Sequence, residues 1–264
     1  MIQPQTLTSV FVFILGLIVG SFANVLIHRL PKEESPISPR SRCPQCGHPI
    51  AFYDNVPVFS YLFLKAHCRH CRGFISLRYP LVELGMGILS LALWRRWQAY
   101  PLWFISSLIS AAALTAISLI DFETFLIPDI LSLGLVFLGL ISAPLNPLFG
   151  QAAWWMKLWI SFKGGLIGFL ICASIAWLGE KMFKKEAMGG GDIKLLAAVG
   201  ALSGALGAFN CLMLGSLLGT VYGLGLIIRG KVTRSDPIPF GPFLSAAAIF
   251  NLFYLLPFGF PFRF

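Results

Sequence analysis

Long apolar runs separated by short polar segments make up most of this chain. Residues 7–27 form an apolar run of roughly the 20 residues that a helix needs to span the hydrocarbon core of a bilayer. The pattern predicts about eight transmembrane helices in all. The other predicted spans are residues 80–97, 102–120, 126–143, 158–179, 193–208, 210–228 and 241–257. The break at Phe209–Asn210 is the weakest, since one long or re-entrant helix would also fit there.

The charges beside the first run predict that it is a retained span. Ser21-Phe22-Ala23 has the small-x-small character of a signal-peptide cleavage site, but residues 1–10 contain no basic residue. Basic residues follow the run instead, beginning with Arg29 and Lys32. This asymmetry predicts that the N-terminus lies outside and that residue 28 onward lies in the cytoplasm.

Composition places the chain among polytopic membrane proteins. It is 57% hydrophobic and 12% charged, whereas a soluble domain has about 25% charged residues. The net charge is +9, and most basic residues fall in the predicted cytoplasmic loops 28–79, 121–125, 180–192 and 229–240. The excess of basic over acidic residues is therefore explained by the orientation of the chain in the membrane rather than by nucleic-acid binding.

Two acids stand at the boundaries of predicted spans, on the same side of the membrane. Asp121 ends an apolar run, and Asp192 follows Gly189-Gly190-Gly191, where we expect an irregular backbone. Ionisable groups at such depths are costly and mark functional sites. Two neighbouring carboxylates can share one proton, so that one activates water and the other polarises a carbonyl. Equally, Asp192 could be a helix N-cap and Asp121 an ordinary interfacial acid.

Two further residues near these acids have competing interpretations. Asp129 is the rival for the first acid, but its place after Pro128 at a helix start favours an N-cap role. Lys194 either anchors its helix at the interface or lowers the pKa of a neighbouring acid, and we favour the anchor. The segment Pro237–Pro242 is either a rigid helix entry or an extended strand that pairs with substrate, and the helix entry is the commoner case.

Four of the six cysteines form two Cys-x-x-Cys pairs within a polar segment. The spacing is that of a tetrahedral four-thiolate zinc site formed by Cys43, Cys46, Cys68 and Cys71. Four sulfur ligands fill the coordination shell of the metal, so such a zinc ion is structural rather than catalytic. On the cytoplasmic side disulfides are disfavoured. The alternatives are replacement of one ligand by His48, His67 or His70, or a redox role. Cys172 and Cys211 lie in apolar runs and are predicted to be packed in the core.

These features predict an all-α polytopic integral membrane protein with a small zinc-binding cytoplasmic insertion after the first helix. Three parts follow: residues 1–27, the first transmembrane helix; residues 28–79, the zinc-binding segment; and residues 80–264, the remaining membrane domain.

A series of motifs from Gly20 to Pro257 resembles the type IV prepilin peptidase family. In this chain the motifs are Gly20-Ser21-Phe22-Ala23-Asn24-Val25-Leu26-Ile27-His28-Arg29-Leu30-Pro31, the two cysteine pairs, Asp54-Asn55-Val56-Pro57, Ser60-Tyr61-Leu62, Arg78-Tyr79-Pro80-Leu81-Val82-Glu83-Leu84, Ile120-Asp121, Leu126-Ile127-Pro128-Asp129, Gly189-x-Gly191-Asp192-Ile193-Lys194 and Pro237-Ile238-Pro239-Phe240-Gly241-Pro242.

The resemblance implies a Gly-x-Gly-Asp aspartyl protease of the bacterial inner membrane, with Asp121 and Asp192 as the catalytic pair and Gly189, Gly191, Lys194 and Asp129 in support. It implies cleavage of type IV prepilins or type II secretion pseudopilins after the glycine that closes a basic leader. It also implies methylation of the new N-terminus with S-adenosylmethionine, and a cytoplasmic domain that binds zinc through the four paired cysteines.

Two positions depart from the family pattern. Glu123 stands where an aspartate is often found, which keeps the carboxylate. Ala66 stands where glycine is common, in the part tied to methylation, so it bears on methyl transfer rather than proteolysis. No Rossmann-type fingerprint marks a methyl-donor site. The resemblance places that site only in the cytoplasmic loop, with Glu83 a candidate for its base, and its other residues are unknown.

Other classes of protein share some of these features. An ion-coupled transporter also has broken helices and buried acids, but it predicts acids near the bilayer midplane and an internal duplication. A non-catalytic assembly factor with a zinc module would leave two acids at matched depth unexplained.

Overall fold

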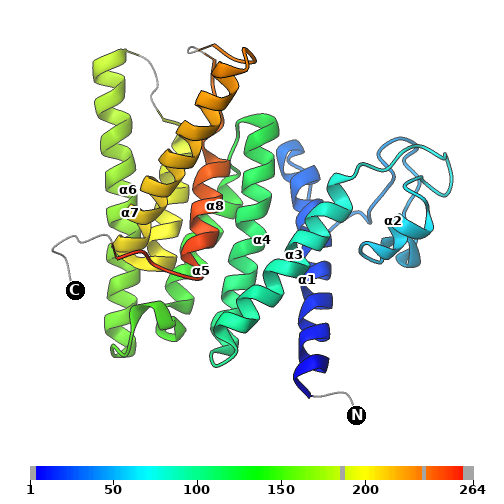
Figure 1. Cartoon of the computed structure of the whole chain (residues 1–264), viewed down its shortest axis with the longest axis horizontal. Helices are drawn as coiled ribbons and strands as arrows, with labels where there is room; N and C mark the ends of the chain where they lie inside the picture. The colour runs from blue at the N-terminus through cyan, green and yellow to red at the C-terminus, as the bar shows by residue number, and fades with distance from the viewer. Residues whose placement is uncertain (1–3, 185–187, 234–235, 258–264) are drawn as a thin grey trace. The chain divides into compact units, whose positions relative to one another are not determined.

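The regular secondary structure of the protein is helical. The computed structural model describes residues 4–184, 188–233 and 236–257, and within these residues there is no β-strand, only two isolated bridges between loop residues (Figure 1). The predicted loop residues 185–187 and 234–235 lie outside the described parts. The chain divides into two compact units, residues 1–98 and 99–264, so the first helix, the cysteine-containing segment and the next helix belong together. The predicted three-part division remains a prediction.

In the first unit, α1 (Pro4–Arg29) packs along α3 (Arg78–Trp97). The two backbones approach closely because small residues line the contact: a Cβ on Gly20 would lie 2.8 Å from the Glu83 Cα. The Ser90 hydroxyl donates a hydrogen bond to the Val12 carbonyl across the pair, at 3.0 Å. The chain between these helices contains only short helical segments: η1 (Leu30–Lys32), η2 (Phe52–Asn55) and α2 (Phe59–Phe63).

In the second unit, long helices pack around α7 (Figure 1). Glycines again allow the closest approach, since a Cβ on Gly164 of α6 would collide with the Gly200 carbonyl of α7. The helix α8 packs against both α4 and α7. The elements are α4 (Pro101–Thr124), α5 (Asp129–Ser142), η3 (Ala143–Leu145), η4 (Pro147–Phe149), α6 (Trp154–Phe183), α7 (Gly190–Ile228) and α8 (Gly241–Asn251).

The interruption of α7 lies at Gly204, so the predicted break at Phe209–Asn210 is wrong in position. Gly204 has φ 74° and ψ −179°, a conformation that only glycine adopts readily. Such a break leaves carbonyls of the preceding turn without their helical donors. Side chains take their place: the Ser161 hydroxyl donates to the Ala201 carbonyl at 2.7 Å, and the Asn146 amide donates to the Leu202 carbonyl at 2.8 Å.

Within the described residues, four helices are long and apolar enough to cross a membrane, which agrees with a membrane protein. They cover residues Gln5–Lys32, Pro101–Thr124, Trp154–Met182 and Gly190–Ile228, and the apolar helix at Asp129–Leu145 is shorter. The buried Cys172 and Cys211 confirm the predicted core positions.

Candidate functional site

Asp121 lies in the last turn of α4, and its side chain is 5% exposed. The helix ends just after it because Phe125 adopts a left-handed conformation, φ 56°, and donates its N–H to the Asp121 carbonyl at 2.9 Å. The backbone N–H of Gly241, at the start of α8, donates a hydrogen bond to Asp121 Oδ2 at 2.8 Å. That oxygen is therefore an acceptor in this hydrogen bond.

Asp192 lies in the first turn of α7. The helix begins at Gly190, with Gly189 as an extended N-cap residue at φ −70° and ψ 147°. The irregular backbone expected across three glycines is thus confined to Gly189, and Asp192 is not the N-cap. Its Oδ1 atom is buried and has no hydrogen-bond partner among the described residues.

The structure brings the two acids together, although 70 residues separate them in the sequence. The carboxylates of Asp121 and Asp192 are close enough to interact electrostatically. Ile127 fixes the elements around them: a Cβ on Gly191 would lie 2.8 Å from the Ile127 Cβ, and one on Gly241 would lie 3.1 Å from its Cδ1. A side chain at position 191 would therefore force a shift, while the contact of Gly241 with Ile127 is tight.

Lys194 and Asp129 form an ion pair beside this site. The lysine Nζ lies 2.7 Å from Asp129 Oδ1 and 2.8 Å from Oδ2. The predicted N-cap role of Asp129 is wrong, since α5 begins at Asp129 itself and Pro128 is the N-cap residue. The pair joins the start of α5 to the first turn of α7. Both side chains are more than a third exposed, so the pair contributes little to stability.

Gly241 is the residue that sequence reasoning missed. The segment before α8 was expected to be a helix entry, and Pro242 does lie in the first turn of the helix. The contact that matters is the N–H of the preceding glycine, which points at an acid 120 residues earlier. A glycine just before a proline at a helix start was the one available signal.

The four paired cysteines form one cluster that can hold a metal ion. Their sulfur atoms all lie within 4.8 Å of one another, and Cys43 Sγ and Cys71 Sγ are 3.9 Å apart. A tetrahedral shell with zinc–sulfur bonds of about 2.3 Å places sulfurs about 3.8 Å apart, so the spacing fits. The cluster contains no histidine among the described residues, since His48 and His70 stack on each other instead, with centroids 3.5 Å apart.

The two cysteine loops have the same backbone fold. Gly47 N–H donates to the Cys43 carbonyl at 2.9 Å, and Arg72 N–H donates to the Cys68 carbonyl at 3.0 Å. The residue after each second cysteine is left-handed, with φ 70° at Gly47 and φ 59° at Arg72. Each loop is closed by an antiparallel bridge. This repeated turn directs two sulfurs from each loop toward a common point.

The crowded sulfurs differ in acidity. The backbone N–H groups of Cys71 and His70 lower the pKa of Cys68 to about 7. The Gly73 N–H acts to lower the pKa of Cys71, but desolvation and the neighbouring thiols outweigh it and raise that pKa to about 11. Four thiolates this close repel one another, so a bound cation is needed to ionise all of them.

Ala66 has a left-handed backbone, with φ 61°. Its N–H donates to the Tyr61 carbonyl at 3.0 Å and its carbonyl accepts from Ile75 N–H at 2.7 Å, so it closes the end of α2. This conformation explains a preference for glycine at the position. Alanine at this position therefore carries backbone strain that glycine would not.

Comparisons with known proteins agree with this arrangement. Residues 14–97 match the bacterial peptidase A24 N-terminal domain, and residues 108–224 match the type IV leader peptidase family. A prepilin leader peptidase/N-methyltransferase from Aeromonas salmonicida (strain A449) is 37% identical over 262 residues, which cover 89% of this chain and 87% of the relative.

Two further relatives have the same name. The protein of Burkholderia pseudomallei (strain K96243) is 37% identical over 283 residues, covering 97% of this chain and 88% of its own, and that of Pseudomonas aeruginosa is 38% identical over 261 residues, covering 89% and 86%. No solved structure matches the chain. From the two family matches and these relatives, the chain belongs to the type IV leader peptidase family.

Proposed function

We propose that this protein cleaves the basic leader from type IV prepilins or type II secretion pseudopilins and methylates the new N-terminus. The names of its relatives support both activities. The observation that best supports the peptidase is the meeting of Asp121 and Asp192, one ending α4 and the other opening α7. Two adjoining carboxylates in a water-poor site are the groups that acid–base hydrolysis of a peptide needs.

In the proposed reaction the two carboxyl groups hold one proton between them. The ionised group removes a proton from water, whose oxygen attacks the carbonyl carbon of the glycine that closes the leader. The protonated group donates a hydrogen bond to that carbonyl, and a proton then passes to the departing amine as the carbon–nitrogen bond breaks. Because Asp121 Oδ2 accepts from Gly241 N–H, the proposal places the shared proton on Asp121 Oδ1 or on Asp192.

The supporting residues hold the elements around the two acids. Gly189 is next to the Asp192 carboxylate, since a Cβ there would lie 3.5 Å from Oδ2, and Gly191 admits Ile127. The Lys194–Asp129 pair keeps the start of α5 against α7. In this proposal Asp129 is a positioning residue and not the first acid of the pair.

The cysteine cluster holds a structural zinc ion in the same proposal. Four sulfur ligands leave no open position for substrate, and the segment that contains them is otherwise built of short helices and loops. The ion would tie the two cysteine loops together. Metal analysis of the purified protein should give about one zinc per chain, and Cys43→Ser should lower that ratio.

For topology we propose an N-terminus outside and both acids at the cytoplasmic face of a bacterial inner membrane. Basic residues concentrate in the predicted cytoplasmic loops, which supports this orientation. Eight crossings result if α7 is counted as two legs that meet at Gly204.

The proposal is tested with purified protein, a prepilin substrate and S-adenosylmethionine. Mass spectrometry of the product should show cleavage after the leader glycine and an added methyl group on the new N-terminus. A product that is cut but never methylated would remove the second activity. A substrate left intact by the folded protein would contradict the peptidase and favour the transporter alternative.

A further inference from the structure

The first unit contains a cavity of about 720 Å³. Its walls come from the last turns of α1, the first turns of α3 and the loops that contain the cysteines. Pockets for small molecules in proteins measure roughly 300–1,000 Å³. The cavity thus has the size of a ligand site, and the peptidase chemistry uses none of its residues.

Hydrogen bonds fix the loops that form this cavity. The buried guanidinium of Arg29 donates to the Ser35 carbonyl at 2.9 Å and to the Pro39 carbonyl at 2.7 Å, which ties the loop to the end of α1. These are charge-assisted bonds, the stronger kind. The end of α1 and the loop therefore form one preformed wall.

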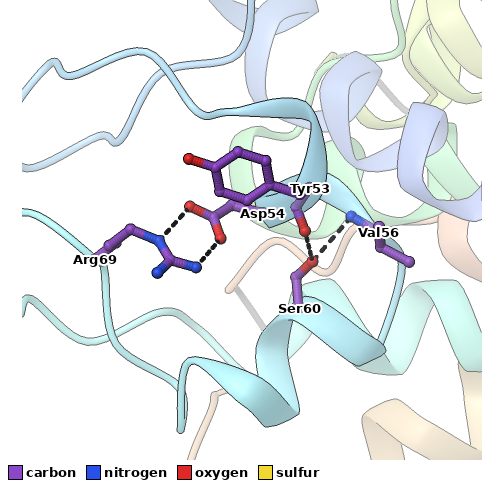
Figure 2. Close-up of polar contacts among 5 residues, drawn as sticks. All are labelled: Tyr53, Asp54, Val56, Ser60 and Arg69. Atoms are coloured by element: carbon purple, nitrogen blue, oxygen red, sulfur yellow. Dashed lines mark hydrogen bonds and ion pairs between the residues drawn. The ribbon is translucent and has the colours of Figure 1, made fainter.

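A second wall of the cavity is fixed by the polar contacts drawn in Figure 2. The Ser60 hydroxyl donates to the Tyr53 carbonyl at 3.0 Å and accepts from Val56 N–H at 2.9 Å, which locks the turn between them. The Arg69 guanidinium donates twice to the Asp54 carboxylate, at 2.8 and 2.6 Å, and lies 5.5 Å from the centre of the Tyr53 ring. All five residues line the cavity.

The first unusual group on the wall is the carboxylate of Glu83, which is 7% exposed. It accepts from Val58 N–H at 2.7 Å and from the Ser21 hydroxyl, both neutral donors. No Lys or Arg in the described parts of the chain forms an ion pair with it. A buried carboxylate without a cation is costly, and a positively charged ligand would supply the missing partner.

The backbone that holds Glu83 is strained. Val58 has φ 63° and ψ −49°, a conformation that a β-branched residue rarely adopts. Strain of this kind costs about 1–3 kcal/mol and gathers at ligand sites. Here it directs the Val58 N–H at the buried carboxylate.

The second unusual group is Asn24, which is 3% exposed. Its Nδ2 donates to the Tyr79 carbonyl at 3.1 Å, so the amide orientation is set. Its Oδ1 is buried and has no hydrogen-bond donor among the described residues. Because this oxygen is closed off from solvent, the Glu83 carboxylate without a cation is the group on the cavity wall that suits an ammonium group.

We infer that this cavity binds S-adenosylmethionine, with the α-ammonium group of the ligand against Glu83. The inference rests on the proposed methyltransferase activity, which requires a methyl donor. The other walls suit the rest of that molecule: Tyr53 and Tyr61 offer ring faces for the adenine, and the guanidinium of Arg40 is available to the carboxylate.

The test is calorimetric binding to the purified full chain in detergent. The probes are S-adenosylhomocysteine, which has the ammonium group, and methylthioadenosine, which lacks the amino-acid part. Glu83→Gln should weaken S-adenosylhomocysteine binding roughly tenfold to a hundredfold, the value of a charged hydrogen bond, and leave methylthioadenosine binding unchanged. Glu33→Gln is the matched control, since it removes the same charge from an exposed residue outside the cavity.

A second measurement does not depend on whether the variant folds. Ultraviolet cross-linking of labelled S-adenosylmethionine to the unmodified protein should label peptides between Ser21 and Glu83. Equal binding of S-adenosylhomocysteine by folded Glu83→Gln, or labelling of other peptides alone, overturns the site. If the protein methylates a prepilin while either result is found, only the site assignment fails; if it never methylates, the proposed function fails.

Discussion

Replacing Gly241 with alanine tests how the catalytic pair is held in place. The N–H of this residue donates to Asp121 Oδ2 at 2.8 Å, and a Cβ added there would lie 2.7 Å from Oδ2 and 3.0 Å from Cγ. Ordinary van der Waals contact begins at 3.4 Å. The new methyl group therefore either displaces the carboxylate or moves the start of α8.

The size of the effect follows from this overlap. Restoring ordinary contact requires a shift of about 0.7 Å at Asp121 Oδ2. A misplacement of about 1 Å at reacting groups costs on the order of a hundredfold in rate. We expect the kcat for prepilin cleavage to fall by roughly tenfold to a hundredfold, or about 1.4–2.7 kcal/mol of activation free energy.

The assay is cleavage of a purified prepilin by wild type, Gly241→Ala and Gly134→Ala in detergent. Gly134 is the matched control because it lies within α5 and a Cβ there would meet nothing within 4 Å. Melting curves show that each variant is folded. If Gly241→Ala cuts with a kcat within twofold of wild type, Gly241 does not hold the acid; if only KM rises, the residue contacts substrate instead.

The remaining predictions concern the ion pairs and one strained residue. Asp129→Asn should break the ion pair with Lys194 but lower the free energy of unfolding by no more than about 1 kcal/mol, and cleavage should remain detectable. Complete loss of cleavage in a folded variant would make Asp129 one of the two catalytic acids. Ala66→Gly should raise unfolding free energy by about 0.5–1 kcal/mol with methylation retained, as seen in melting curves and product masses, and a lower melting temperature would contradict the strain argument. The hydrogen bond from Arg69 lowers the pKa of Asp54 below its ordinary 3.8. The pair therefore stabilises the fold above pH 3.8, and this stabilisation is lost as the pH falls through the lowered pKa. Asp54→Asn should flatten the profile of melting temperature against pH over that acidic range.

Much of the helical framework and both candidate sites could be predicted from sequence. Apolar runs are long and distinctive, so the positions of α1, α4 and α6 follow from hydropathy alone. The cysteine cluster follows from its spacing, because two Cys-x-x-Cys turns can meet only in a few ways. The predicted topology placed Asp121 and Asp192 at the same face of the membrane, so that they could meet, and in the structure the two carboxylates are close enough to interact.

What sequence did not predict depends on contacts between distant segments. The break in α7 lies at Gly204 rather than at Phe209–Asn210 because Ser161 and Asn146, from other elements, bond the carbonyls that the break exposes. No local pattern reveals those partners. The Gly241 contact with Asp121 is missed for the same reason, since it joins residues far apart in the chain.

Backbone conformation was the other hidden property. Ala66 and Val58 both have positive φ, although neither residue type favours it. Surrounding hydrogen bonds impose these conformations, through Ile75 at Ala66 and through Glu83 at Val58. A sequence position therefore shows which residue is present but not the strain it bears.

The most direct test of hydrolysis by Asp121 and Asp192 is prepilin cleavage by Asp121→Asn and Asp192→Asn, each compared with wild type and with Asp129→Asn. Both substitutions should abolish cleavage while melting curves and zinc content stay near those of wild type. Asp129→Asn should still cut. Cleavage by folded Asp121→Asn or Asp192→Asn would contradict the claim that these two acids perform the hydrolysis.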